Sequence, residues 1–132
     1  MLEREEFEKL VEEEFPRAIP EKFRGSIKNV ALLVEDEPSL RVREEYELGE
    51  GDTLFGLYRG IPLPERGGHY GIGETMPDTI TLYRVPILTH AGEDLAAIRK
   101  EIRDTIWHEV AHYFGFDEGK VGKRERDGSN YS

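Results

Sequence analysis

Two histidines and a glutamate near the carboxyl end of the sequence have the residue types and spacing best suited to chemistry. His108-Glu109-Val110-Ala111-His112 follows the pattern HExxH. Residues four positions apart lie on one face of a helix, so both imidazoles can reach a single zinc ion. Glu109 would then lie beside the ion without having to bind it. In a hydrolytic site of this form, zinc polarises a water molecule, and the glutamate accepts its proton and later delivers it to the leaving amine.

A glycine three residues after the second histidine indicates where a third ligand is found. Gly115 can adopt the left-handed conformation that ends a helix and turns the chain back. Such a turn would bring Asp117 or Glu118 toward the metal, and a catalytic zinc site needs three protein ligands. We favour Glu118, with Asp117 second and Glu125 as an outside alternative. A site of two histidines and a carboxylate can also accept Fe, Co, Ni or Mn, so the expected cofactor is one Zn²⁺ or another divalent ion.

The motif lies on the longest predicted element, a helix from about Gly92 to Phe114. Apolar side chains recur along this helix at helical spacing, at Leu95, Ile98, Ile102, Ile106, Val110 and Tyr113. At about 100° per residue, His108 and His112 fall to one side of the apolar stripe, with Glu109 between the two faces. The helix is therefore predicted to bury one face and to offer chemistry on another.

Shorter elements precede this helix. Apolar periodicity predicts a helix over residues 2–14, and a proline suited to a first helical turn predicts a second over residues 38–48. Runs of β-branched or alternating apolar residues predict strands over residues 27–34, 53–58 and 78–88. Pro16 is expected to end the first helix, whose acidic residues should face solvent, and Pro38 to begin the second. The strand over residues 27–34 is expected to be buried, and the last strand to finish near Pro86. Prolines and glycines favour a loop over residues 61–77.

The composition excludes several classes of function. A net charge of −10 repels nucleic-acid phosphates and anionic lipid headgroups, so neither kind of partner is expected. The chain contains no cysteine, which excludes thiol nucleophiles, disulfides and iron–sulfur clusters. It shows neither a signal peptide nor an apolar run of about 20 residues, which predicts a cytoplasmic protein. Its 132 residues suggest a single domain over residues 1–132, with residues 119–132 as a flexible polar tail.

Residues outside the motif are weaker candidates for function. His69 could enter the cleft as an extra ligand or a substrate contact, although a loop histidine is more often only exposed. His90 is expected to have no special role, and Trp107 is expected to pack in the core. Three aromatic hydroxyls could stabilise a developing oxyanion, although each more often serves packing: those of Tyr70, Tyr83 and Tyr113.

One strand could also bind substrate. Thr79–Val85 could form a sheet edge on which an extended peptide pairs, with residues 65–77 as a lid. The equally weighted alternative is a structural strand followed by an ordinary connecting loop.

Together, these residues resemble a known family. The run from His108 to Glu118 resembles the extended zincin signature HExxHxxGxx(H/D/E), with an acidic residue where metzincins have their third histidine. With the long helix, the segments Leu57–Leu63 and Ile80–Leu88 are similar to the small bacterial "minimal zincin" family of metallopeptidase-like proteins. The resemblance spans roughly Ile27 to Glu118. No methionine follows the motif, so the chain departs from the ordinary metzincins, which carry a Met-turn there.

The resemblance implies a fold and a set of roles. The expected fold is a reduced zincin α+β fold, a small mixed β-sheet packed against helices that include the HExxH helix. By the same resemblance, His108, His112 and Glu118 are metal ligands and Glu109 is the catalytic base. The predicted function is zinc-dependent hydrolysis of a peptide or of a small or unfolded protein. The alternative is a non-catalytic metal-binding or interaction module that retains the zincin scaffold.

Overall fold

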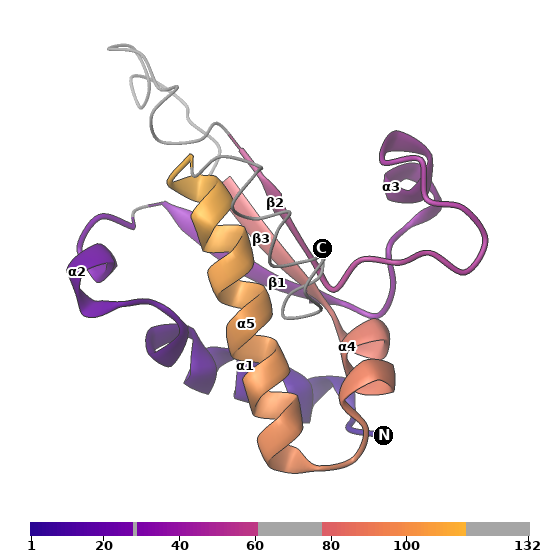
Figure 1. Ribbon diagram of the computed structural model, residues 1–132, viewed down its shortest axis with the longest axis horizontal. Coiled ribbons are helices and arrows are strands. Elements are labelled where there is room, and N and C mark those ends of the chain that lie inside the picture. Colours follow the sequence, from indigo (N-terminus) through magenta and orange to yellow (C-terminus); the bar gives the residue numbers. More distant parts are fainter. Residues whose placement is uncertain (28, 61–77, 116–132) are drawn as a thin grey trace.

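The structure is a computed structural model that describes residues 1–27, 29–60 and 78–115. Its helices and strands form an α+β arrangement in which a three-stranded mixed sheet packs against helices, as predicted (Figure 1). In chain order the elements are α1 (Arg4–Ala18), α2 (Glu21–Arg24), β1 (Val30–Glu35), α3 (Leu40–Glu45), β2 (Gly56–Arg59), β3 (Asp78–Tyr83), α4 (Arg84–Ala91) and α5 (Leu95–Tyr113). The predicted loop over residues 61–77 and the predicted tail over residues 119–132 lie outside the described residues.

The sheet has the order β1-β3-β2, with β1 parallel and β2 antiparallel to the central strand β3. Ile80 in β3 is paired with Leu32 on one side and with Tyr58 on the other. The hypothesis that Thr79–Val85 is a sheet edge open to a peptide is therefore wrong, because both sides of β3 are already hydrogen-bonded within the sheet. Among the described strands, the edges belong to β1 and β2.

The long helix α5 crosses in front of the sheet in the view of Figure 1 and contacts β2, β3, α1 and α4. Its predicted apolar stripe forms much of the core, because Ile102 and Ile106 are fully buried and Val110 is nearly so. These side chains belong to one cluster with Phe7 from α1 and Ile80 from β3. The helical spacing in the sequence therefore identified the buried face of α5, apart from its first member, Leu95, which is half exposed.

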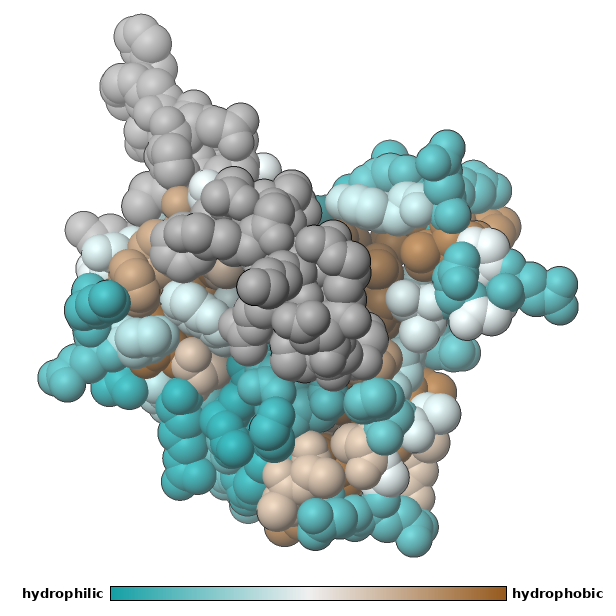
Figure 2. All heavy atoms as spheres, in the orientation of Figure 1, coloured by the Kyte–Doolittle hydropathy of each residue, from teal (hydrophilic) through white to brown (hydrophobic). Residues whose placement is uncertain are grey.

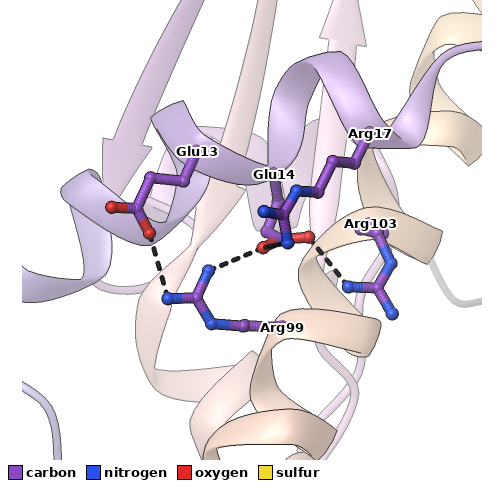
Figure 3. Close-up of polar contacts among 5 residues, drawn as sticks. All are labelled: Glu13, Glu14, Arg17, Arg99 and Arg103. Atoms are coloured by element: carbon purple, nitrogen blue, oxygen red, sulfur yellow. Dashed lines mark hydrogen bonds and ion pairs between the residues drawn. The ribbon is translucent and has the colours of Figure 1, made fainter.

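A buried glutamate links α1 to α5 (Figure 3). The Glu14 side chain is fully buried and accepts hydrogen bonds from Arg99 (2.6 Å) and Arg103 (2.8 Å), both on α5. Arg17 approaches the same carboxylate at 3.5 Å, and Glu13 pairs with Arg99 at 3.0 Å. The expectation that the acidic residues of this helix face solvent is therefore wrong for Glu14. The paired charges fix the position of α5 against α1.

Several element boundaries differ from the predictions. Helix α1 continues through Pro16 to Ala18, because a proline in the last turn removes only one of the helix's hydrogen bonds. Helix α3 begins after Ser39, whose side chain accepts a hydrogen bond from the Val42 N–H (3.2 Å), rather than at Pro38. Strand β1 is half-buried rather than buried, because it lies at an edge, and the Leu33 side chain is 45% exposed.

The largest difference concerns the segment after β3. The sequence predicts a strand over residues 78–88, but the strand ends at Tyr83 and helix α4 follows directly. Pro86 is the third residue of α4, where the missing N–H is tolerated because the first N–H groups of a helix have no intrahelical partner. The Val85 N–H donates instead to the carbonyl of Asp36 (3.0 Å). This contact between segments distant in sequence anchors the start of α4.

Candidate metal centre

Helix α5 places His108, Glu109 and His112 together near its carboxyl end. One potential ligand atom from each residue lies within 4.8 Å of the others. His108 and Glu109 are almost completely buried, His112 is half-buried, and the two imidazole centroids are 5.1 Å apart. Two imidazole nitrogens and a carboxylate at this spacing are a donor set that suits a divalent cation such as zinc. The residues therefore fit a metal ion, as the HExxH spacing predicts.

The end of the helix also follows the prediction. Helix α5 finishes at Tyr113, and Gly115 adopts a φ of 75°, in the left-handed region that glycine enters without strain. The Gly115 N–H donates to the carbonyl of His112 (2.9 Å). The chain therefore turns immediately after the second histidine. The three proposed third ligands, Asp117, Glu118 and Glu125, lie outside the described residues.

Glu109 is held by the neighbouring edge strand, a contact that no pattern in the sequence indicates. The backbone N–H of Tyr58 in β2 donates to Oε1 of Glu109 (2.9 Å). The Tyr58 hydroxyl donates to Oδ2 of the buried Asp78 (2.7 Å), at the start of β3. The second oxygen of Glu109, Oε2, lies 3.7 Å from Nε2 of His108. One carboxylate oxygen is thus fixed by the sheet, and the other faces the histidines.

Gly56 sets the close approach of β2 to α5. A Cβ atom at this position would lie 2.7 Å from Cγ2 of Thr105 and 3.3 Å from Cγ of Glu109. Thr105 is fully buried, so it has little freedom to move aside. A side chain here would push the strand away from the helix and pull the Tyr58 N–H from Glu109.

We expect Gly56→Ala to lower the free energy of unfolding by about 1–3 kcal/mol, the usual cost of overpacking a core contact. Urea unfolding would measure this change. Gly25→Ala is the matched control, because no atom lies within 4 Å of its Cβ position and its φ of −72° suits alanine. Equal stabilities of the two variants would show that the contact between β2 and α5 is not tight.

A polar row continues from the histidines toward the amino end of α5. Thr105 and Glu101 occupy the same face, three and seven residues before His108. Nε2 of His90, in the last turn of α4, lies 3.7 Å from Oε2 of Glu101. The centroid of the His90 ring is 5.2 Å from the centroid of the Phe55 ring. Burial raises the pKa of Glu101 above its usual value, although the electrostatic interaction with His90 acts to lower it.

Among the described residues, the other candidates from the sequence are not part of this group. Trp107 packs against the core, with its ring 5.8 Å from that of Phe23, as predicted. Tyr83 is buried in a separate cluster with Leu54 and Leu57, and burial raises its pKa to about 12. The buried Tyr113 donates from its hydroxyl to a backbone carbonyl, that of Ser26 (3.4 Å). His69 and Tyr70 lie outside the described residues.

The combination of a small mixed sheet, a helix packed across it and an HExxH group on that helix defines a zincin-like protein. Residues 27–127 match the family model described as "Zincin-like metallopeptidase", and the chain belongs to this family. No curated protein matches the chain. Within the described residues, no helix is both long and apolar enough to cross a membrane.

A solved structure is also similar to this chain. It is a conserved hypothetical protein from Thermo thermophilus, 22% identical, with a TM-score of 0.46. The alignment covers 92% of this chain and 99% of that chain. A similarity this weak supports no conclusion about function, so the assignment rests on the family match and the HExxH group.

Proposed function

We propose that this chain is a zinc-dependent peptidase in which His108, His112 and Glu118 bind the metal and Glu109 is the general base. The observation that carries the proposal is the convergence of two imidazoles and a carboxylate within 4.8 Å on one helix, in a member of a metallopeptidase family. Its substrate would be a peptide or a small or unfolded protein. The third ligand, Glu118, is proposed from the sequence signature.

The geometry suggests how Glu109 would act in peptide hydrolysis. A bound zinc ion supplies Lewis acidity, which polarises the peptide carbonyl and makes water a stronger acid. Glu109 Oε1 is held by the Tyr58 N–H, so Oε2, which faces the histidines, is the oxygen positioned to accept the proton. Water adds its oxygen to the carbonyl carbon, the C–N bond breaks, and Glu109 returns the proton to the leaving amine. Burial of the carboxylate shields this proton transfer from bulk solvent.

Cleavage assays on zinc-loaded protein test the proposal directly. A mixed peptide library would be incubated with the protein, with and without a chelator, and the products identified by mass spectrometry. We expect cleavage that the chelator stops and added zinc restores. Stoichiometric zinc binding without cleavage would contradict the peptidase proposal and indicate the non-catalytic metal-binding module instead.

The metal ligands can be tested separately by measuring zinc content. We expect wild-type protein to hold about one zinc per chain, and His112→Ala and Glu118→Gln to hold far less after dialysis, because each removes one of three ligands. Asp117→Asn is the matched control for the acidic ligand, and His90→Ala is the control for the histidine. Loss of zinc from Asp117→Asn, with retention in Glu118→Gln, would reassign the third ligand to Asp117.

A further inference from the structure

The polar row on α5 runs alongside the edge strand β2. Glu101 and Thr105 lie on the same helix face as the two histidines of the motif. Gly56 in β2 packs against Thr105, and Phe55, just before β2, lies beside His90. The row therefore follows one side of the strand from the candidate metal centre to the start of β2.

Glu101 is a largely buried carboxylate with no hydrogen bond in the described part of the chain. Its side chain is 14% exposed, and Oε1 is buried without a hydrogen-bond partner. Nε2 of His90 lies 3.7 Å from Oε2 of Glu101, a separation too long for a hydrogen bond. The neighbouring Lys100 pairs with Asp104 instead (2.7 Å).

The buried Glu101 carboxylate destabilises the folded protein unless a bound ligand supplies its missing hydrogen bonds. A buried polar oxygen without a partner destabilises the folded protein, and native structures contain few of them. The Thr105 hydroxyl, next along the row, is also fully buried without a hydrogen-bond partner. The row opens to solvent at His90, whose side chain is 47% exposed. Figure 2 shows hydrophilic atoms over the middle of α5, whereas the atoms around its first turn are less hydrophilic.

We propose that Glu101, beside the exposed His90, forms a subsite that binds a Lys or Arg side chain of the peptide substrate. This inference rests on the proposed peptidase function. The Glu101 carboxylate would accept hydrogen bonds from the cationic group. Glu101 thereby selects substrates by charge, which the metal-binding motif itself does not do.

The position of Glu101 also predicts where in the substrate the basic residue lies. Glu101 precedes His108 by seven residues, or about 10 Å along a helix that rises 1.5 Å per residue. An extended peptide advances about 3.3 Å per residue. Dividing the helix distance by the rise of the extended peptide places the bound side chain about three residues from the cleaved bond.

A positional scan of labelled peptides tests this selection. Glycine- and alanine-based peptides would each carry one lysine at a different position, or norleucine as its uncharged counterpart. Their affinities for the zinc-loaded Glu109→Gln protein would be measured by fluorescence anisotropy, and cleavage of the unlabelled norleucine peptides by the wild-type protein would be followed by mass spectrometry. We expect one lysine position to bind about tenfold more tightly than norleucine.

Adding Glu101→Gln to the same protein should reduce this lysine preference to below about twofold, because the amide carries no charge. Glu12→Gln is the matched control, since it removes an exposed carboxylate from α1 and should leave the preference intact. The preference is a ratio of two affinities, so a partial loss of folded protein does not change it.

The outcomes separate this inference from the proposed function. Cleavage of the norleucine peptides without a lysine preference at any position would overturn the subsite and leave the peptidase proposal standing. A lysine preference that survives Glu101→Gln would also overturn it. Peptides that are neither bound nor cleaved would overturn both.

Discussion

Replacement of Glu109 by glutamine is expected to lower peptide cleavage by at least about 100-fold while the zinc content stays unchanged, because general-base catalysis typically contributes this much. The amide has nearly the same shape as the carboxylate, and its oxygen can still accept the Tyr58 N–H that holds Oε1. It cannot accept the proton of the attacking water. The value of kcat/KM would be measured by mass spectrometry of the products, with zinc content determined on the same samples.

The control for this variant is Glu12→Gln, which makes the same chemical change at an exposed position on α1. It should retain wild-type cleavage. If Glu109→Gln cleaves at the wild-type rate, Glu109 is not the base. If the variant loses zinc together with activity, the carboxylate acts as a ligand, which its place within 4.8 Å of the imidazole nitrogens would allow.

The sequence predicted those parts of the fold that depend on local periodicity. The face of α5 that carries Ile102 and Ile106 follows from apolar spacing alone, since one helix sets both the pattern and the burial. Helix α4 was missed because Val85 and Ile87 are β-prone, and a contact to Asp36 from another part of the chain anchors its start. The sequence left open whether β3 lies at a sheet edge, since strand order depends on pairing between distant segments.

The same distinction between local patterns and contacts of distant segments applies to the candidate metal centre. His108, Glu109 and His112 were predicted because one helix turn fixes their relative positions. The Tyr58 N–H that holds Glu109 is 51 residues away in sequence, and no local pattern marks it. Buried Glu14 did carry a signal: it lies three and four residues after Val11 and Leu10, which are themselves buried. An acidic residue on an apolar stripe predicts a buried partner of opposite charge.

We expect Glu14→Gln to lower the free energy of unfolding by about 3 kcal/mol at neutral pH, the low end for breaking a buried ion pair. The substitution leaves Arg99 and Arg103 without their buried counter-charge. Both arginines are about one-third exposed, so water can replace part of the lost interaction and keep the cost near this lower end. Urea unfolding followed by circular dichroism would measure the change.

The pH dependence of the same variant identifies the cause. Burial alone would raise the pKa of Glu14, but hydrogen bonds from Arg103 and Arg99 outweigh it and lower the pKa below its usual value of 4.5. Because the pKa is lower in the folded than in the unfolded chain, ionised Glu14 stabilises the fold above about pH 4.5, and this stability is lost as the pH falls through the folded pKa. The stability difference between wild type and Glu14→Gln should therefore shrink below about pH 4.5.

The control is Glu13→Gln, which removes a half-exposed partner of Arg99 and should lower the free energy of unfolding by no more than about 1 kcal/mol at any pH. Equal effects of the two variants would show that burial of Glu14 does not strengthen its ion pairs.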